Sequence, residues 1–222
     1  MRGTTGLLGA IVFFTAGVAP VAAQQPQAWQ RKWFWGAQSG AFIYKVPGST
    51  GVQVALDAGA HWLITGKRSA MFVAFDQLIF KSNTRSLVFD GSGATGFRTV
   101  TFSGARRLQV ALYAVPTDKK LQIYAGGGLA IHQITNATAL GPFATSQEAS
   151  TAANAVAKVD TKAFAVISGG VQYRFRERWA VYGHYQLMPS SKNFLISSTQ
   201  QAITGGVRFA LTTSHEDVST AR

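Results

Sequence analysis

The sequence contains no cysteine. The protein therefore cannot form a disulfide, bind a metal through thiolates, use a cysteine nucleophile or be anchored by a lipid on a cysteine. Acidic residues are also scarce, because 9 Asp and Glu stand against 21 Lys and Arg, which gives a net charge of +12. This balance suits an anionic partner, such as nucleic acid, anionic lipid or the phosphates of lipopolysaccharide.

Long hydrophobic runs are missing as well, apart from one near the start of the chain. Residues 7–18 are mostly apolar, follow Arg2 and precede the small residues Val21, Ala22 and Ala23. This stretch is too short to cross a bilayer as a helix, and its flanks are those of an export signal. We therefore predict a signal peptide over residues 1–23. Export argues against nucleic acid as the partner of the basic charge.

The remainder of the chain shows apolar residues that alternate with polar or small ones. In the segment 121–132, Leu121, Ile123 and Ile131 fall on one face, whereas Gln122 and His132 fall on the other. A period of two residues predicts strands. Similar strand-like segments lie at 33–44, 52–65, 69–80, 108–113, 163–175, 179–187 and 202–211. Together they predict one all-β domain over residues 24–211, followed by a polar tail at 212–222.

The connections between these segments alternate in length. Those near 66–68, 116–120 and 176–178 are short and charged, whereas 81–96, 135–160 and 189–198 are longer and polar. Tight turns on one side and long loops on the other are typical of an up-and-down barrel in the outer membrane. The composition of 135–160 is wrong for a packed core, which favours a disordered tip over a recognition loop for host, phage or partner cells.

The tryptophans gather at one predicted rim. Trp33 and Trp35 begin the first strand, Trp62 precedes a predicted periplasmic turn, and Trp179 follows another, with Trp29 just upstream. Tryptophan prefers the interface between membrane and water, so these residues predict an aromatic girdle. A soluble lipocalin-like carrier, the alternative fold, would instead place apolar residues inside and polar residues outside.

Three motifs carry a resemblance to known proteins. The last strand resembles the C-terminal assembly signal of outer-membrane barrels, in which Thr204, Gly206, Phe209 and Leu211 fill the characteristic places. The glycine-punctuated segments 126–128 and 169–170 and the run Tyr182-Gly183-His184-Tyr185 resemble the small outer-membrane barrel superfamily of the OmpA/OmpX type. The likeness covers nearly the whole chain after the signal.

This resemblance implies an eight-stranded antiparallel up-and-down transmembrane β-barrel in the outer membrane of a diderm bacterium. It also implies contact with outer-membrane lipid and lipopolysaccharide, and insertion by the barrel assembly machinery. We expect a monomer whose outer loops could meet a host or partner cell. The resemblance implies nothing about an activity.

Several charged residues fall on the predicted inward face. A buried charge is costly unless it is paired, so we expect salt bridges in the lumen between the two aspartates and some of the arginines. A barrel of eight strands is just wide enough to be filled by side chains, which favours a plug over a narrow solute channel. The predicted polar network comprises Asp57, His61, Asp76, Arg107, Arg174, His184 and Arg208.

No catalytic, cofactor or metal site is predicted. Residues 91–96 match the glycine pattern of a dinucleotide loop, but a strand-like segment follows where a helix is required, so we expect a flexible loop. His132 and His184 lie near Thr135 and Tyr185, yet no spacing of nucleophile and base stands out. A lipid-active barrel enzyme therefore stays a minor alternative to a structural or surface-interaction role.

Arg106 breaks the alternation of its segment, because it falls on the predicted lipid face. It lies close to the predicted outer interface, where a charge costs little and lipid phosphates are near. Arg106 is therefore a candidate for lipopolysaccharide contact. Snorkelling of its side chain or a bulge in the strand are the structural alternatives.

Overall fold

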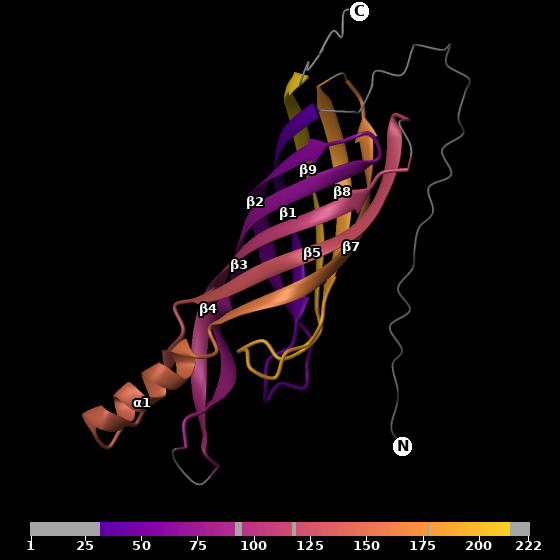
Figure 1. Cartoon of the computed structure of the whole chain (residues 1–222). Coiled ribbons are helices and arrows are strands. Elements are labelled where there is room, and N and C mark those ends of the chain that lie inside the picture. Colours follow the sequence, from indigo (N-terminus) through magenta and orange to yellow (C-terminus); the bar gives the residue numbers. More distant parts are fainter. Residues whose placement is uncertain (1–31, 92–94, 117–118, 177, 214–222) are drawn as a thin grey trace, which may run out of the picture.

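The computed structural model describes residues 32–91, 95–116, 119–176 and 178–213, and these form a closed barrel (Figure 1). Neighbouring strands run antiparallel, and pairing of the first strand with the last closes the barrel. The predicted all-β, eight-stranded, up-and-down fold is confirmed. The eight long strands are β1 (Lys32–Tyr44), β2 (Gln53–Thr65), β3 (Ser69–Phe89), β4 (Phe97–Ala114), β5 (Leu121–Thr135), β7 (Thr161–Arg174), β8 (Trp179–Met188) and β9 (Gln200–Thr213).

The predicted signal peptide, Trp29 and most of the predicted tail lie outside the described residues. The last strand extends two residues beyond the predicted range at each end, and at its C-terminal end Thr212 and Thr213 still belong to β9. Both residues pair with the start of β1, which extends the closing seam of the barrel. Among the described residues, no helix has the length and apolar composition needed to cross a membrane.

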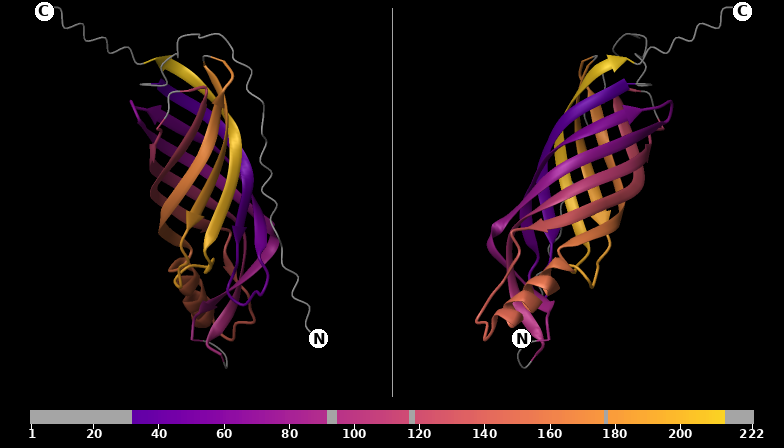
Figure 2. Two further views of the ribbon diagram at one scale, coloured as in Figure 1. Left: turned by 90° about the vertical axis from the view of Figure 1, so that its right-hand side faces the viewer. Right: turned by 60° about the vertical axis from the view of Figure 1, so that its left-hand side comes forward.

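The two ends of the barrel differ in their connections. Short turns join the strands at one end, whereas β3 and β4 continue at the other as a hairpin that projects beyond the barrel, beside the helix α1 (Ser146–Ala157) (Figures 1 and 2). We call this the outer end, because long loops of outer-membrane barrels face the exterior. The outer platform is defined here as residues 84–91 and 95–102, β6 (Thr138–Ala139), α1 and the connections 45–52, 140–145 and 189–199.

The faces of the strands follow the predicted alternation. Ile123 and Leu129 of β5 are 64% and 63% exposed on the outside, while Gln122 and His132 are fully buried inside. Large apolar side chains cover the outward faces of all eight long strands, which forms a belt that only lipid can cover favourably. This arrangement is the reverse of a soluble carrier, with its apolar interior.

Arg106 points outward, and a bulge lies next to it. Gly104 and Ala105 are both buried, so the alternation of β4 shifts by one residue there. The register between β3 and β4 shifts at the same place, between Ile79 and Thr84. Arg106 and Arg107 themselves lie in the regular register on the barrel side of the bulge, where Arg106 pairs with Gln77 and faces out while Arg107 pairs with Asp76 and faces in.

The expectation of disorder over residues 135–160 is wrong, because this segment forms β6 and α1. The hydroxyl of Thr145 accepts a hydrogen bond from the Glu148 N–H at 3.1 Å and caps the helix, and Ala152 and Val156 are buried. Short alanine-rich helices need only one buried stripe to be held in place. Residues 135–160 therefore form no hydrophobic core of their own, but their small and apolar side chains suffice for a helix that packs against the rest of the outer platform.

Candidate functional site

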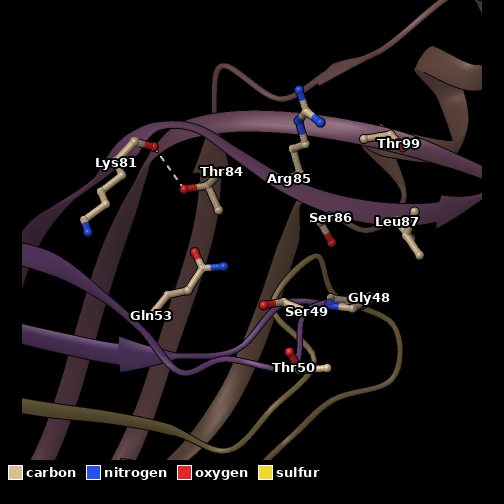
Figure 3. Close-up of a pocket in the computed structure, with 11 residues that line it drawn as sticks. Gly48, Ser49, Thr50, Gln53, Lys81, Thr84, Arg85, Ser86, Leu87 and Thr99 are labelled. Carbon is tan, nitrogen blue, oxygen red and sulfur yellow. Dashed lines mark hydrogen bonds between the residues drawn. The ribbon is translucent and has the colours of Figure 1, made fainter.

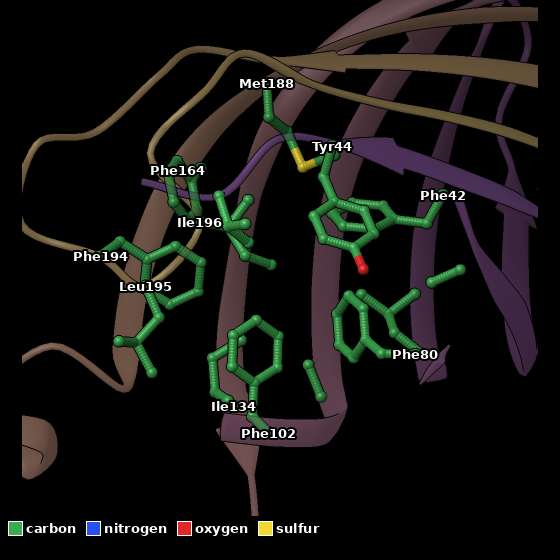
Figure 4. Packing of buried hydrophobic residues seen from close by; sticks show 14 of the residues in the cluster. Phe42, Tyr44, Phe80, Phe102, Ile134, Phe164, Met188, Phe194, Leu195 and Ile196 are labelled. Carbon is green, nitrogen blue, oxygen red and sulfur yellow. The ribbon is translucent and has the colours of Figure 1, made fainter. Parts of the chain in front are cut away.

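The outer mouth of the barrel is closed by an apolar layer, which we call the outer plug (Figure 4). Phe42 and Tyr44 of β1 and Phe80 of β3 reach it from the wall, and Phe194, Leu195 and Ile196 reach it from the connection between β8 and β9. The last three are at most 3% exposed. Hydrogen bonds fix that connection, since Ser86 Oγ donates to the Leu195 carbonyl at 2.8 Å.

A salt-bridged layer lies below the plug. Arg107 Nη2 donates to Asp57 Oδ2 at 2.5 Å and to Asp76 Oδ2 at 2.7 Å, and its Nε donates to Asp76 Oδ2 at 3.0 Å. The side-chain amide of Gln38 donates to the other oxygen of Asp76. Asp57, Asp76 and Arg107 are 0% exposed. One guanidinium therefore ties β4 to both β2 and β3 across the lumen.

A second cation, Arg208, is connected to the first through hydrogen bonds. Its Nε donates to His61 Nε2 at 2.9 Å, so this imidazole is neutral with its proton on Nδ1. His61 Nδ1 lies 3.2 Å from the hydroxyl of Tyr182, and that hydroxyl donates to Gln38 Oε1 at 2.7 Å. The Arg208 guanidinium also lies 3.7 Å from the centre of the Tyr182 ring. The polar layer is therefore one connected network.

The remaining predicted lumen residues lie apart from this network. His184 contacts the hydroxyls of Tyr113 and Tyr124 at 3.3 and 3.5 Å, within an aromatic layer near the short-turn end. Arg174 lies at the rim itself, where its Nη2 donates to the Lys119 carbonyl at 3.2 Å. The structure thus brings five of the seven predicted residues into one network, with His184 in the adjacent aromatic layer and Arg174 at the short-turn rim.

Sequence reasoning missed Gln38, because the facing of the segment 33–44 could not be settled from its residues. Aromatic side chains occupy successive positions there, at Trp33, Phe34 and Trp35, so apolar side chains fall on both faces and the pattern does not tell inside from outside. The register with β2 resolves the question: Gly40 pairs with the inward Asp57, which places Gln38 inward as well. The sequence signal that could have identified Gln38 is its position two residues from both Gly36 and Gly40, which places all three on the same face of the strand.

The outer platform is held by a further buried cation, Arg98, which the sequence did not single out. Its Nε donates to Asp90 Oδ2 at 2.5 Å, and its Nη2 pairs with Glu148 of α1. Its Nη1 donates to the Leu140 carbonyl at 3.2 Å, and the guanidinium lies 4.6 Å from the centre of the Phe143 ring. One side chain therefore joins the β3–β4 hairpin to the helix.

Glu148 should make the platform sensitive to acid. Its carboxylate accepts the Ala144 N–H at 2.8 Å and pairs with Arg98, and these two contacts lower the pKa of Glu148 from 4.5. A lowered pKa means that the contacts stabilise the folded platform above pH 4.5 and are lost as the pH falls through the lowered value. Hydrogen exchange of α1, normalised to that of β5, should accelerate in wild type as the pH falls through the lowered pKa of Glu148, whereas the normalised exchange of Glu148→Gln should not change over the same pH range.

A polar groove of about 610 Å³ lies between the connection 45–52 and β3 (Figure 3). Its lining holds hydroxyl side chains and two cations, Lys81 and Arg85, but no carboxylate. Neither cation has an ion pair among the described residues. The groove is lined by Pro47, Gly48, Ser49, Thr50, Gln53, Lys81, Thr84, Arg85, Ser86, Leu87 and Thr99.

The predicted girdle tryptophans all point outward near the short-turn end. Trp35 lies directly opposite Trp62 on one side and Phe209 on the other, and Phe209 lies opposite Trp179. The rings of Trp35 and Trp62 are 4.2 Å apart between centroids. These four aromatic side chains form one row across β2, β1, β9 and β8, while Trp33 lies nearer the rim of the same face. Such a row suits a membrane interface.

The residues of the predicted assembly signal lie along the closing strand. Phe209 and Leu211 of β9 face outward, whereas Thr204 and Gly206 face the lumen. Gly206 pairs with Gln38 and Thr204 with Gly40, so the signal lies in the seam with β1.

His132 and His184 lie in separate layers of the lumen. His132 is fully buried among the rings of Phe42, Phe164 and Phe194. His184 faces the lumen while Tyr185 faces outward and donates to Gln201 Oε1 at 3.1 Å. In the part of the chain that the structure describes, no three His, Asp or Glu side chains gather as metal ligands.

No protein family and no curated protein matches the sequence. Among solved structures, Neisserial surface protein A is similar with a TM-score of 0.55 at 12% identity, over 80% of this chain and 96% of that one. The N-terminal β-barrel domain of OprF from Pseudomonas aeruginosa follows with a TM-score of 0.43 at 10% identity, over 79% and 96%. OprG, an outer membrane protein of the same organism, has a TM-score of 0.43 at 11% identity, over 82% and 94%.

At 12% identity, the likeness to Neisserial surface protein A concerns the fold alone. The apolar belt and the tryptophan row add independent evidence for a bilayer around the barrel. In its fold, the chain is a closed eight-stranded antiparallel barrel similar to that of Neisserial surface protein A, and an apolar belt covers its outward surface.

Proposed function

We propose that this protein is a non-conducting, non-catalytic barrel that anchors an interaction surface, the outer platform, at the cell exterior. The observation that carries this proposal is the contrast between the two parts of the molecule. The lumen is filled by the outer plug, the salt-bridged network and the aromatic layer, whereas the outer end continues as an ordered hairpin and helix. A filled barrel serves as an anchor, and an ordered outer end can present a fixed surface.

The filled lumen argues against the solute channel. A solute would have to displace Phe194, Leu195 and Ile196, which are buried in the outer plug, and then separate Arg107 from its aspartates. Leaving a buried charge without its partner costs about 3–5 kcal/mol, so a lumen opened at this layer would be a sparsely populated state. The three cavities described on this barrel, with volumes from about 420 to 750 Å³, are all lined by residues of the outer end rather than by the network.

Planar-bilayer recording tests this proposal. The wild-type barrel should insert without conductance steps, because the plug and the network close the lumen in series. A quadruple variant that opens both layers is the positive control for insertion, and it should conduct. It combines Phe194→Ser, Leu195→Ser and Ile196→Ser in the plug with Arg107→Ser in the salt-bridged layer. Stable ohmic steps from the wild type would overturn the non-conducting function.

Lipopolysaccharide is the proposed lipid partner, and Arg106 is its proposed contact. Arg106 is exposed at the outer edge of the belt, directly opposite the outward Gln77 and Gln133. Gln77, Arg106 and Gln133 therefore form a row in which one guanidinium, flanked by two side-chain amides, could bind a lipid phosphate. Arg106→Ala should weaken lipopolysaccharide binding by the purified barrel about fivefold, while Arg176→Ala at the short-turn end should not. Equal lipopolysaccharide binding by wild type, Arg106→Ala and Arg176→Ala would rule out Arg106 as the contact. The barrel assembly machinery is proposed as a further partner, through the β9 signal.

A further inference from the structure

Several large apolar side chains are exposed far from the belt. Leu87 and Phe89 at the end of β3 and Phe97 at the start of β4 are 37%, 66% and 53% exposed. They belong to the projecting hairpin, which lies beyond the barrel wall (Figures 1 and 2). Apolar side chains that gather on a surface outside the membrane mark an interaction site. All three line the same cleft.

This outer cleft has a volume of about 750 Å³ and lies between the hairpin, α1 and the connection 189–199. The volume is within the roughly 300–1,000 Å³ of small-molecule sites. Its deep wall includes Val88 and Phe194, which are buried members of the outer plug. Phe89 and Phe97 meet edge to face, with centroids 5.4 Å apart, and form the open wall.

The rim of the outer cleft is polar and cationic. Lys158 and Lys192 lie on opposite segments, at the end of α1 and in the connection 189–199, together with Asn154 and Asn193. The described lining holds one carboxylate, Asp90, and Arg98 already pairs with it at 2.5 Å. Neither lysine has an ion pair in the described part of the chain. Two lysines therefore line the cleft without an ion-pair partner among the described residues.

The walls of the outer cleft are fixed before any ligand binds. The N–H of Leu195 donates to the Val159 carbonyl at 3.3 Å and joins the connection 189–199 to the end of α1. The N–H of Lys158 donates to the Asn154 carbonyl at 3.2 Å and ends the helix there. Preformed walls reduce the entropy lost on binding.

From the apolar walls and the cationic rim we propose that the outer cleft binds an amphipathic carboxylate, with an apolar body against Leu87, Phe89 and Phe97 and its headgroup between Lys158 and Lys192. An uncharged apolar molecule would leave both ammonium groups without a partner. A purely polar anion would leave the phenylalanine rings exposed. The inference rests on the proposed function in one respect, namely that the outer platform is the interacting surface.

Uptake of labelled decanoate by the full barrel in nanodiscs of zwitterionic lipid tests the inference, with empty nanodiscs subtracted. We expect saturable binding of one decanoate per barrel. Lys158→Gln with Lys192→Gln should weaken it about tenfold, which corresponds to about 1.4 kcal/mol. The matched control Lys45→Gln with Lys162→Gln removes the same charge at the outer end outside the cleft and should bind as wild type does. Binding of decanol, which has no charge, should be the same in all three proteins.

A filled cleft provides a second test. Ala155 is half-buried on the cleft side of α1, so Ala155→Trp should occupy the cleft and abolish decanoate binding, while hydrogen exchange of α1 checks that the platform stays folded. The inference is overturned by the absence of saturable uptake, by equal losses in the two lysine variants, or by wild-type binding in a folded Ala155→Trp variant. A silent barrel that does not bind decanoate contradicts this inference alone, whereas a conducting barrel that binds it contradicts the proposed function alone.

Discussion

Replacing Arg107 with methionine should destabilise the folded barrel by about 3–5 kcal/mol. Arg107 is fully buried and supplies the positive charge for both Asp57 and Asp76, which are equally buried. Without it, two carboxylates would remain at one level of the lumen with no cation within reach, and each would be costly to hold in a medium of low polarity. Urea unfolding in detergent micelles, followed by heat-modifiable migration on a gel, measures the loss.

Removing the whole cluster distinguishes a charge effect from a packing effect. The triple variant Asp57→Asn, Asp76→Asn, Arg107→Met should recover most of the lost stability, because no uncompensated charge remains. If the single Arg107→Met variant unfolded at the same urea concentration as wild type, the Arg107 guanidinium would not be the group that ties β2, β3 and β4 together.

Replacing Gly128 with alanine should cost about 3 kcal/mol, at the upper end for an overpacked site. Gly128 faces the lumen from β5, where a Cβ would lie 2.0 Å from the carbonyl oxygen of Val110 on the neighbouring strand. The clash is with backbone, so no side chain can move to relieve it, and the pairing of β4 with β5 would have to shift. The same urea titration measures the effect.

Gly183 provides the matched control. It lies in β8 on the outward face, and a Cβ there would meet nothing within 4 Å. Gly183→Ala should change the stability by no more than about 0.5 kcal/mol. Equal effects of Gly128→Ala and Gly183→Ala would mean that the close approach of β4 and β5 at Gly128 does not occur in the folded barrel.

The strands and their faces could be predicted because a period of two residues fixes them locally. The inward direction of Asp57 follows from the alternation, because Val54 and Leu56 lie on the opposite face. The segment 69–80 shows no clear alternation, so the inward direction of Asp76 is expected from its charge. The belt follows from the alternation. Which arginine meets which aspartate does not follow from it, because Arg107 is separated by 50 residues from Asp57 and its partner depends on the register of three strands.

The outer platform could not be predicted for a related reason. Arg98 and Glu148 are also 50 residues apart, and they meet only because the hairpin projects beyond the barrel while α1 packs beside it. The segment around Glu148 is short of large apolar residues, so composition suggests disorder although a capped helix forms. For Arg174, the alternation predicts the inward side of β7 but not the height along the barrel. Arg174 is the last residue of β7 and lies at the short-turn rim.

Labelling of single cysteines on whole cells tests most directly whether this barrel lies in the outer membrane with its platform outside. The natural chain has no cysteine, so any label reports the introduced position. Ala153→Cys, exposed on α1, should react with a membrane-impermeant maleimide on intact cells of a diderm host, whereas Lys67→Cys in a short turn should react only after the outer membrane is permeabilised. Labelling of Lys67→Cys on intact cells at the rate of Ala153→Cys, or recovery of both proteins in the soluble fraction, would contradict this placement.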